Sequence, residues 1–134
     1  MRRLRVWREE QGAAIVEFAL VLPLLLLVLW GIIDIGRAFY TLNNLASAVR
    51  EGARRAAVMP SDPSSGPNTL IVRNTVVNVF SPIGGPLPAE SVFVSVAGRQ
   101  VTVTASYPFA PLVLAENWKF AIRRSAVFRW EQAP

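Results

Sequence analysis

The sequence predicts an α+β fold in which a long N-terminal helix carries a small antiparallel β-sheet. Residues 13–33 form an apolar run that contains a single charged residue, Glu17. Residues 34–58 continue with apolar residues at three- and four-residue spacing, which is the period of an amphipathic helix. Residues 91–107 then alternate between apolar and polar side chains, as half-buried strands do.

The apolar run is long enough to cross a membrane. As a helix, residues 13–33 would rise ~32 Å, close to the ~30 Å hydrocarbon core of a bilayer. Four arginines precede the run and Arg37 follows it, an asymmetry that places the N-terminus in the cytoplasm and the rest outside. The alternative is a cleaved secretory signal, but its apolar core is usually ~7–15 residues, and the nearest A-x-A, at 46–48, lies beyond Asp34 and Arg37. The prediction is therefore a single-pass anchor in the inner (cell) membrane.

The helix should continue beyond the bilayer to Val58. From Ala13 its length would be ~69 Å. The positions expected to face the domain core are Ile35, Phe39, Leu42, Leu45 or Ala46, Val49, Ala53 and Ala56. Pro23 lies inside the apolar run, where a proline removes one backbone hydrogen bond and usually kinks a helix. Pro23 is thus either a tolerated membrane proline or a helix kink at which the chain bends on assembly.

The junction between the charged leader and the apolar run is the most informative segment. Gly12 stands at this junction, and Glu17 follows five residues later. A charge at mid-bilayer costs ~2.5–3.5 kcal/mol on insertion scales, so a lone carboxylate in the run requires an explanation. One explanation is that Glu17 snorkels to the nearby interface. The other is an ion pair with the α-amine of Ala13, which cleavage after Gly12 would free and which is largely cationic near neutral pH.

This segment resembles the class III signal of type IV pilin-like proteins and, more narrowly, the TadE-like pseudopilins of Tad (Flp) pilus assembly. The resemblance is carried by GAAIVEFALVLP (12–23), ASAVREGARRAAV (46–58) and VTVTASYPFAPL (101–112). It implies a pilin-like fold and a role as a minor pseudopilin, a structural component of the pilus.

The resemblance also implies that a prepilin peptidase, a membrane aspartic protease, cuts between Gly12 and Ala13, and that Glu17 is the recognition and assembly carboxylate. The other partners implied are pilins, pseudopilins and the pilus assembly platform. Ala13 in place of the aromatic first residue of ordinary pilins fits a pseudopilin better.

Residues 59–134 should form a small periplasmic α+β domain, after a leader at 1–12, a transmembrane helix at 13–33 and an amphipathic extension at 34–58. Residues 69–80 fit a helix capped by Asn68, although their β-branched content would also suit a strand; we favour the helix. Two loop segments rich in proline, glycine and serine, 59–68 and 81–88, should flank this segment.

Three or four strands are expected to pack on the outer half of the long helix. Residues 91–97 and 100–107 should pair through a tight turn at Gly98-Arg99, and Pro108 to Pro111 should end the second strand. A further strand should begin near Trp118. Its apolar face should resume at 127–130 after a bulge near Arg124-Ser125.

Composition argues against an enzyme. The chain has 134 residues, a net charge of +5, and no cysteine or histidine, which removes thiolate chemistry and the commonest general base and metal ligand. The acidic residues are scattered, and no phosphate-binding glycine loop is present. We therefore expect no cofactor, metal, small-molecule substrate or nucleic acid. The alternative to a pseudopilin is a single-pass, signal-anchored protein with a small periplasmic binding domain that does not polymerise.

Overall fold

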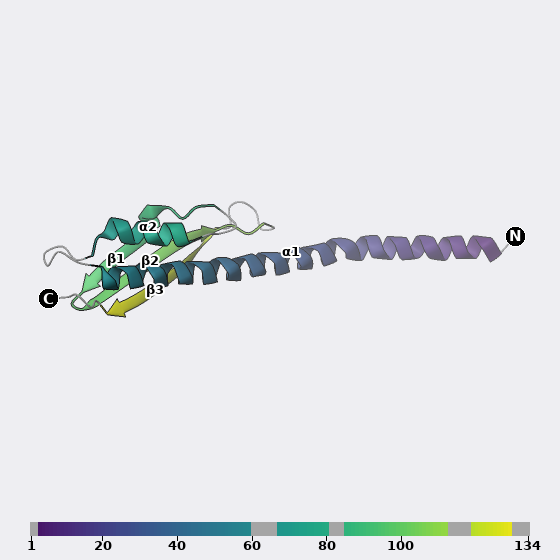
Figure 1. Cartoon of the computed structure of the whole chain (residues 1–134). Coiled ribbons are helices and arrows are strands. Elements are labelled where there is room, and N and C mark those ends of the chain that lie inside the picture. Colours follow the sequence, from purple (N-terminus) through teal and green to yellow (C-terminus); the bar gives the residue numbers. More distant parts are fainter. Residues whose placement is uncertain (1–2, 60–66, 81–84, 113–118, 130–134) are drawn as a thin grey trace.

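The computed structural model describes residues 3–59, 67–80, 85–112 and 119–129, with side chains described from Gly12 onward. The predicted α+β fold is confirmed. A long helix and a short helix accompany one three-stranded antiparallel sheet (Figure 1). The elements in chain order are α1 (Arg3–Val58), α2 (Thr69–Val79), a 3₁₀ turn (Ala89–Ser91), β1 (Val92–Ala97), β2 (Gln100–Phe109) and β3 (Phe120–Arg129).

Helix α1 dominates the shape of the molecule. It is continuous from Arg3, so the helix already includes most of the expected leader, and it ends at Val58 as predicted. Figure 1 shows its N-terminal half projecting well beyond the rest of the chain, whereas its C-terminal half lies along α2 and the sheet. One helix therefore forms both the projecting arm and a structural part of the small helix-and-sheet domain, which we call the outer domain because it lies farthest from the N-terminus.

The first two strands form the predicted hairpin. Ala97 pairs with Gln100, so Gly98 and Arg99 make a two-residue turn. Gly98 has φ +57°, in the left-handed region, while no non-glycine residue in the described chain has a positive φ. This combination fits a type II′ turn, which needs glycine at its first central position. The strand order is β1-β2-β3, which makes β2 the central strand.

Strand β2 runs two residues further than predicted. Pro108 and Phe109 pair with Ala121 and Phe120 of β3, whereas the sequence suggested that Pro108 would end the strand. The proline is accommodated because the pairing of β1 stops at Ala105, so β2 has a strand on one side only at this point. Phe109 is thereby placed at the end of the sheet nearest the apolar half of α1.

Strand β3 contains no bulge, so that prediction was wrong. Its register with β2 is regular from Phe120 to Arg129. Ile122 and Ala126 point toward α1, and Arg124 occupies the position between them on the same face. Because β3 is an edge strand, Arg124 remains exposed at the rim of the sheet and no extra residue is needed to turn it outward. Trp118 and Trp130, expected to extend this strand, lie outside the described residues.

The segment after the second loop is a helix, as we favoured. Asn68 caps α2: its side-chain oxygen accepts hydrogen bonds from the backbone N–H groups of Leu70 (3.1 Å) and Ile71 (3.3 Å). These bonds satisfy two of the four N–H groups that a helix start leaves without partners. Val72 and Val76, one turn apart, are fully buried and direct this helix onto α1. Burial on one face outweighs the β propensity of the valines.

The core lies between α1, α2 and one face of the sheet. From α2 and the segment before β1 it takes Val72, Val76, Phe80 and Leu87; from the sheet it takes Val92, Val101, Val103, Ala105, Tyr107, Phe109 and Ile122. Helix α1 adds a stripe of Leu45, Ala48, Val49, Ala53 and Ala56. The alternation predicted for β2 is therefore confirmed.

Two positions predicted to face the core, Ile35 and Phe39, are instead 59% and 62% exposed. The buried stripe of α1 instead continues through Thr41 to the half-buried Ala38 and Asp34. These two residues directly precede Phe39 and Ile35 in the sequence, so they face a neighbouring side of the helix. Only the tips of β2 and β3 reach this level of α1. The sheet consequently leaves the neighbouring apolar face uncovered.

Gly52 is the point of closest approach between the two helices. A Cβ atom added here would collide with the side chain of Val76, which is fully buried and β-branched and therefore cannot rotate away easily. Only glycine allows α2 to sit this close to α1.

We expect Gly52→Ala to lower the free energy of unfolding by ~1–3 kcal/mol, the range found for overpacked cores. Thermal unfolding of the full chain in detergent, followed by near-UV circular dichroism, would measure the change. Gly36→Ala is the matched control, because an added Cβ at Gly36 meets nothing within 4 Å. A Gly52→Ala protein as stable as the Gly36→Ala protein would contradict this account of the packing.

Candidate functional site: the membrane-proximal half of the long helix

The first half of α1 is an apolar helix that nothing in the described chain covers. Ile15, Phe18 and Leu20 are 69%, 62% and 75% exposed, and comparable exposure continues through Ile33. Among the described residues, one helix is long and apolar enough to cross a membrane, and none of its most apolar stretch is buried. A core helix of a soluble domain would be covered on at least one side. This pattern suggests membrane anchoring.

The residues predicted to direct processing and assembly all lie on this exposed helix. Gly12, Ala13 and Glu17 are in α1, and all three are exposed. Ala13 and Glu17 are four residues apart, which puts them on the same face with ~6 Å of axial rise between them. Any amine created at Ala13 would therefore lie one turn from the Glu17 carboxylate of its own chain. The roles of these residues stay predictions.

Pro23 is also within α1, and the helix continues on both sides of it. The freed carbonyl one turn earlier does not interrupt the helical assignment. A bend at Pro23 during assembly stays a prediction.

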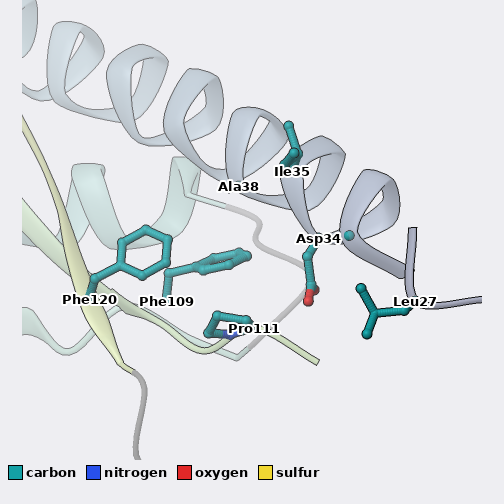
Figure 2. A pocket seen from close by; sticks show the side chains of 8 residues that line it. Leu27, Asp34, Ile35, Ala38, Phe109, Pro111 and Phe120 are labelled. Carbon is teal, nitrogen blue, oxygen red and sulfur yellow. The ribbon is translucent and has the colours of Figure 1, made fainter. Parts of the chain in front are cut away.

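A carboxylate marks the point where the bare part of α1 meets the outer domain. Asp34 accepts hydrogen bonds from the backbone N–H of Leu112 at 2.8 and 3.0 Å and from the Arg37 guanidinium at 2.9 Å. Leu112 follows β2, so this contact joins residues 78 positions apart in the sequence. Figure 2 shows Asp34 on α1, facing Pro111 and the end of β2. We call this contact the Asp34 clamp.

The environment of the clamp strengthens it. The side chains of Arg37 and Asp34 are only 19% and 13% exposed, so their ion pair is screened less than a surface pair. The Arg37 guanidinium also lies 5.4 Å from the centre of the Phe109 ring, within range of a cation–π contact. Phe109 in turn packs against Phe120, with ring centres 5.1 Å apart. Charge and aromatic packing thus hold the tips of β2 and β3 against α1.

Burial and ion pairing shift pKa values elsewhere in the outer domain. Burial raises the pKa of the Tyr107 phenol, and the nearby positive charge of Arg37 offsets part of this shift. The hydrogen bond from Arg54 holds the pKa of the Glu51 carboxyl below its usual value. The Glu51–Arg54 pair is on the exposed face of α1, far from the membrane-proximal end. Neither group belongs to a cluster with catalytic geometry.

Sequence reasoning used Asp34 and Arg37 to mark the end of the apolar run, and Arg37 in the charge asymmetry across it, but it did not pair the two residues. Their pairing was readable from the three-residue spacing, because residues i and i+3 on a helix are neighbours. The bond to Leu112 was not readable, because no local pattern links the two positions. Among the described residues, no group of three or more His, Cys, Asp or Glu side chains is placed to hold a metal ion.

Comparison with protein families matches residues 12–54 to the model described as TadE-like protein. This segment is TadE-like. The match confirms the resemblance where its most specific motif lies, and it covers Gly12, Glu17, Pro23 and both side chains of the clamp. No curated protein and no solved structure matches the chain.

The TadE-like match ends within the second half of α1. The C-terminal stretch 101–112, which also carried the resemblance, lies outside it. TadE-like proteins are structural pilus components rather than an enzyme family. Together, the match and the exposed apolar helix support a membrane protein associated with a Tad pilus system.

The Asp34 clamp can be tested by the exchange of a single amide. Asp34→Ala should speed hydrogen exchange at the Leu112 amide about tenfold, because a hydrogen bond to a charged group contributes ~1.5–3 kcal/mol and this one is partly open to water. Hydrogen exchange with mass spectrometry on the full chain in detergent would measure it. Glu51→Ala removes the exposed Glu51–Arg54 pair instead and should leave Leu112 unchanged. Equal exchange in wild type and Asp34→Ala would contradict the clamp.

Proposed function

We propose that this chain is a minor pseudopilin, a structural and assembly component of a Tad (Flp) pilus. The observation that carries the proposal is the TadE-like match over residues 12–54, which begins at Gly12, the junction of the leader and the exposed apolar helix. The outer domain, built on the C-terminal half of the same helix, supports a subunit role, because packing on one helix rigidly couples anchor and domain.

The proposed topology follows from charge. The N-terminus is cytoplasmic, residues 13–33 span the inner membrane, and residues 34–134 lie in the periplasm. Four arginines in the leader against Arg37 alone just after the span support this orientation. The domain is basic overall and keeps Glu51 and Arg54 paired on its exposed surface.

Processing by a prepilin peptidase is the next step in the proposal. The enzyme removes residues 1–12 by hydrolysing the peptide bond between Gly12 and Ala13. This leaves Ala13 with a free amine, which is cationic near neutral pH. Gly12 carries no side chain, and an added Cβ would meet nothing within 4 Å in this chain. Any requirement for glycine at position 12 would therefore come from the peptidase and not from the fold of the substrate.

Glu17 then acts as the assembly carboxylate. It sits in exposed apolar surroundings, and within the part of the chain whose side chains are described it forms no ion pair. In a packed assembly, the Ala13 amine of a neighbouring subunit supplies the opposite charge. The pair sets the axial register of the subunits, because in a low-dielectric setting neither charge is stable alone.

Gly12→Val should abolish removal of the leader, because the branched side chain would occupy the peptidase subsite for the residue before the cut. Intact mass of the membrane-extracted protein, after co-expression with a prepilin peptidase, would show retention of residues 1–12. Gly36→Val is a matched control, since it changes a glycine of the same helix that also has open space around it. Normal cleavage of Gly12→Val would overturn the assignment of the peptidase.

Glu17→Ala should insert into the membrane at least as well as wild type, since it removes a charge from the apolar run. It should nevertheless reduce pilus output and co-purification of neighbouring subunits, because losing one partner of a buried ion pair costs ~3–5 kcal/mol. Both readouts would be taken from cells that contain correctly cleaved protein. If Glu17 only snorkels to the interface, both will equal wild type, and the assembly role fails.

A further inference from the structure

A cavity of about 340 Å³ lies between α1 and the tips of β2 and β3 (Figure 2). Its lining comes from two parts of the chain that meet only in the folded protein. Helix α1 contributes Leu27, Gly31, Asp34, Ile35 and Ala38, and the outer domain contributes Phe109, Pro111 and Phe120. The cavity is open to the surroundings. We call it the junction pocket.

The junction pocket straddles the expected surface of the membrane. Leu27 and Gly31 belong to the span predicted at 13–33, whereas Ala38 lies beyond its end. Leu27 and Ala38 are separated by ~16 Å along the helix axis. The domain therefore overhangs the last turns of the apolar run, and the pocket opens at the depth of the acyl chains in the leaflet nearest the domain.

The lining fits an apolar ligand. Seven of the eight lining residues carry no charge, and the eighth, Asp34, is already engaged with Arg37 and the Leu112 amide. A second hollow of about 280 Å³ continues the same surface along Phe39, Leu42 and Ile122. Ile35 and Phe39 are more than half exposed on this face of α1, whereas the neighbouring face of the helix packs against the domain. Such contiguous apolar surface outside a core marks an interaction site.

The size of the junction pocket favours a slender ligand. At 340 Å³ it is at the small end of the ~300–1,000 Å³ found for ligand pockets, whereas a helix with its side chains is ~10–12 Å wide. Acyl chains are slender and, next to the span, are the most concentrated apolar groups available. Continuity between the exposed apolar face of α1 and the mouth of the pocket gives them a direct path inside.

We propose that the junction pocket holds one acyl chain of a phospholipid from the leaflet nearest the domain, and that this lipid seats the domain on the membrane surface. The inference rests on the membrane anchoring in the proposed function, but not on cleavage or entry into a pilus. The Asp34 clamp forms part of the wall of the pocket, because Asp34 lines it and fixes the end of β2 against α1.

The test places a photo-crosslinking side chain in the pocket. Phe120→p-benzoylphenylalanine, in full-length protein in native membranes, should yield a lipid adduct detectable by intact mass. Gly31→Leu in the same protein should reduce this adduct about tenfold, which corresponds to ~1.4 kcal/mol of lost binding. Gly31 lines the pocket and an added Cβ there meets nothing within 4 Å, so leucine can fill the space without disturbing the fold.

Three matched controls make the result specific. Gly36→Leu also enters open space on α1 but outside the pocket, so it should leave the adduct unchanged. The same photo-crosslinker at Phe93, exposed on the opposite face of the sheet, should give no lipid adduct. At Leu24, within the span, it should give lipid adducts in every variant.

Several outcomes would overturn the proposal. A Phe120 probe that crosslinks to another protein would assign the pocket to a neighbouring subunit, and one that crosslinks within its own chain would assign it to another segment of this protein. Lipid adducts at Leu24 without any at Phe120 would overturn the lipid site while leaving the anchoring intact. Absence of lipid adducts at Leu24 as well would overturn the anchoring itself, and the pocket proposal with it.

Discussion

The packing of small α1 residues against α2 and the sheet is the contact on which the rest of this structure depends. Ala48, Gly52, Ala53 and Ala56 offer little side-chain bulk, so two layers can approach the helix closely. The closest approach is at Gly52, where Val76 occupies the space of a side chain. This contact makes the second half of α1 part of a core, while its first half has no cover. The two halves of one helix therefore lie in different environments. One half is proposed to lie in the apolar bilayer, and the other packs in the interior of a small domain.

The junction between these two environments is held by a different kind of interaction. Apolar packing ends near Ala38, and beyond it, toward the N-terminus of α1, the domain is tied to the helix by the hydrogen bonds of Asp34 and by Arg37 over Phe109. A charged clamp at this position is compatible with the interface of a membrane, where polar groups can be hydrated from one side. It also neutralises the carboxylate and the guanidinium internally. The clamp explains how the overhanging tips of β2 and β3 can stay in place beside an otherwise apolar helix.

The differences between prediction and structure have a common cause. Pro108 was expected to end a strand because a proline cannot donate a hydrogen bond to a neighbouring strand. A bulge was expected near Arg124-Ser125 because the apolar face of the strand resumes only after these residues. In the folded domain, β1 is too short to reach Pro108, and β3 is an edge strand that leaves Arg124 at the rim. Ile35 and Phe39 were placed on the core face by their spacing, but only the tips of β2 and β3 reach this level of α1, and they leave this face of the helix uncovered. In each case the local sequence pattern was read correctly. How far the neighbouring strand extends decided whether the strand ended, bulged or covered the helix.

The sequence by itself determined the elements whose signals are local and repetitive. A long apolar run followed by helical periodicity defined α1 up to Val58, alternation defined β2, and the glycine at 98 defined the hairpin. It also determined the TadE-like character of residues 12–54, because that motif is contiguous. Only the tertiary structure could decide that Asp34 binds Leu112, that Gly52 receives Val76, and that Leu27 shares a pocket with Phe120. These contacts join residues far apart in the chain, and their distances depend on how α1 crosses the sheet, which no local propensity encodes.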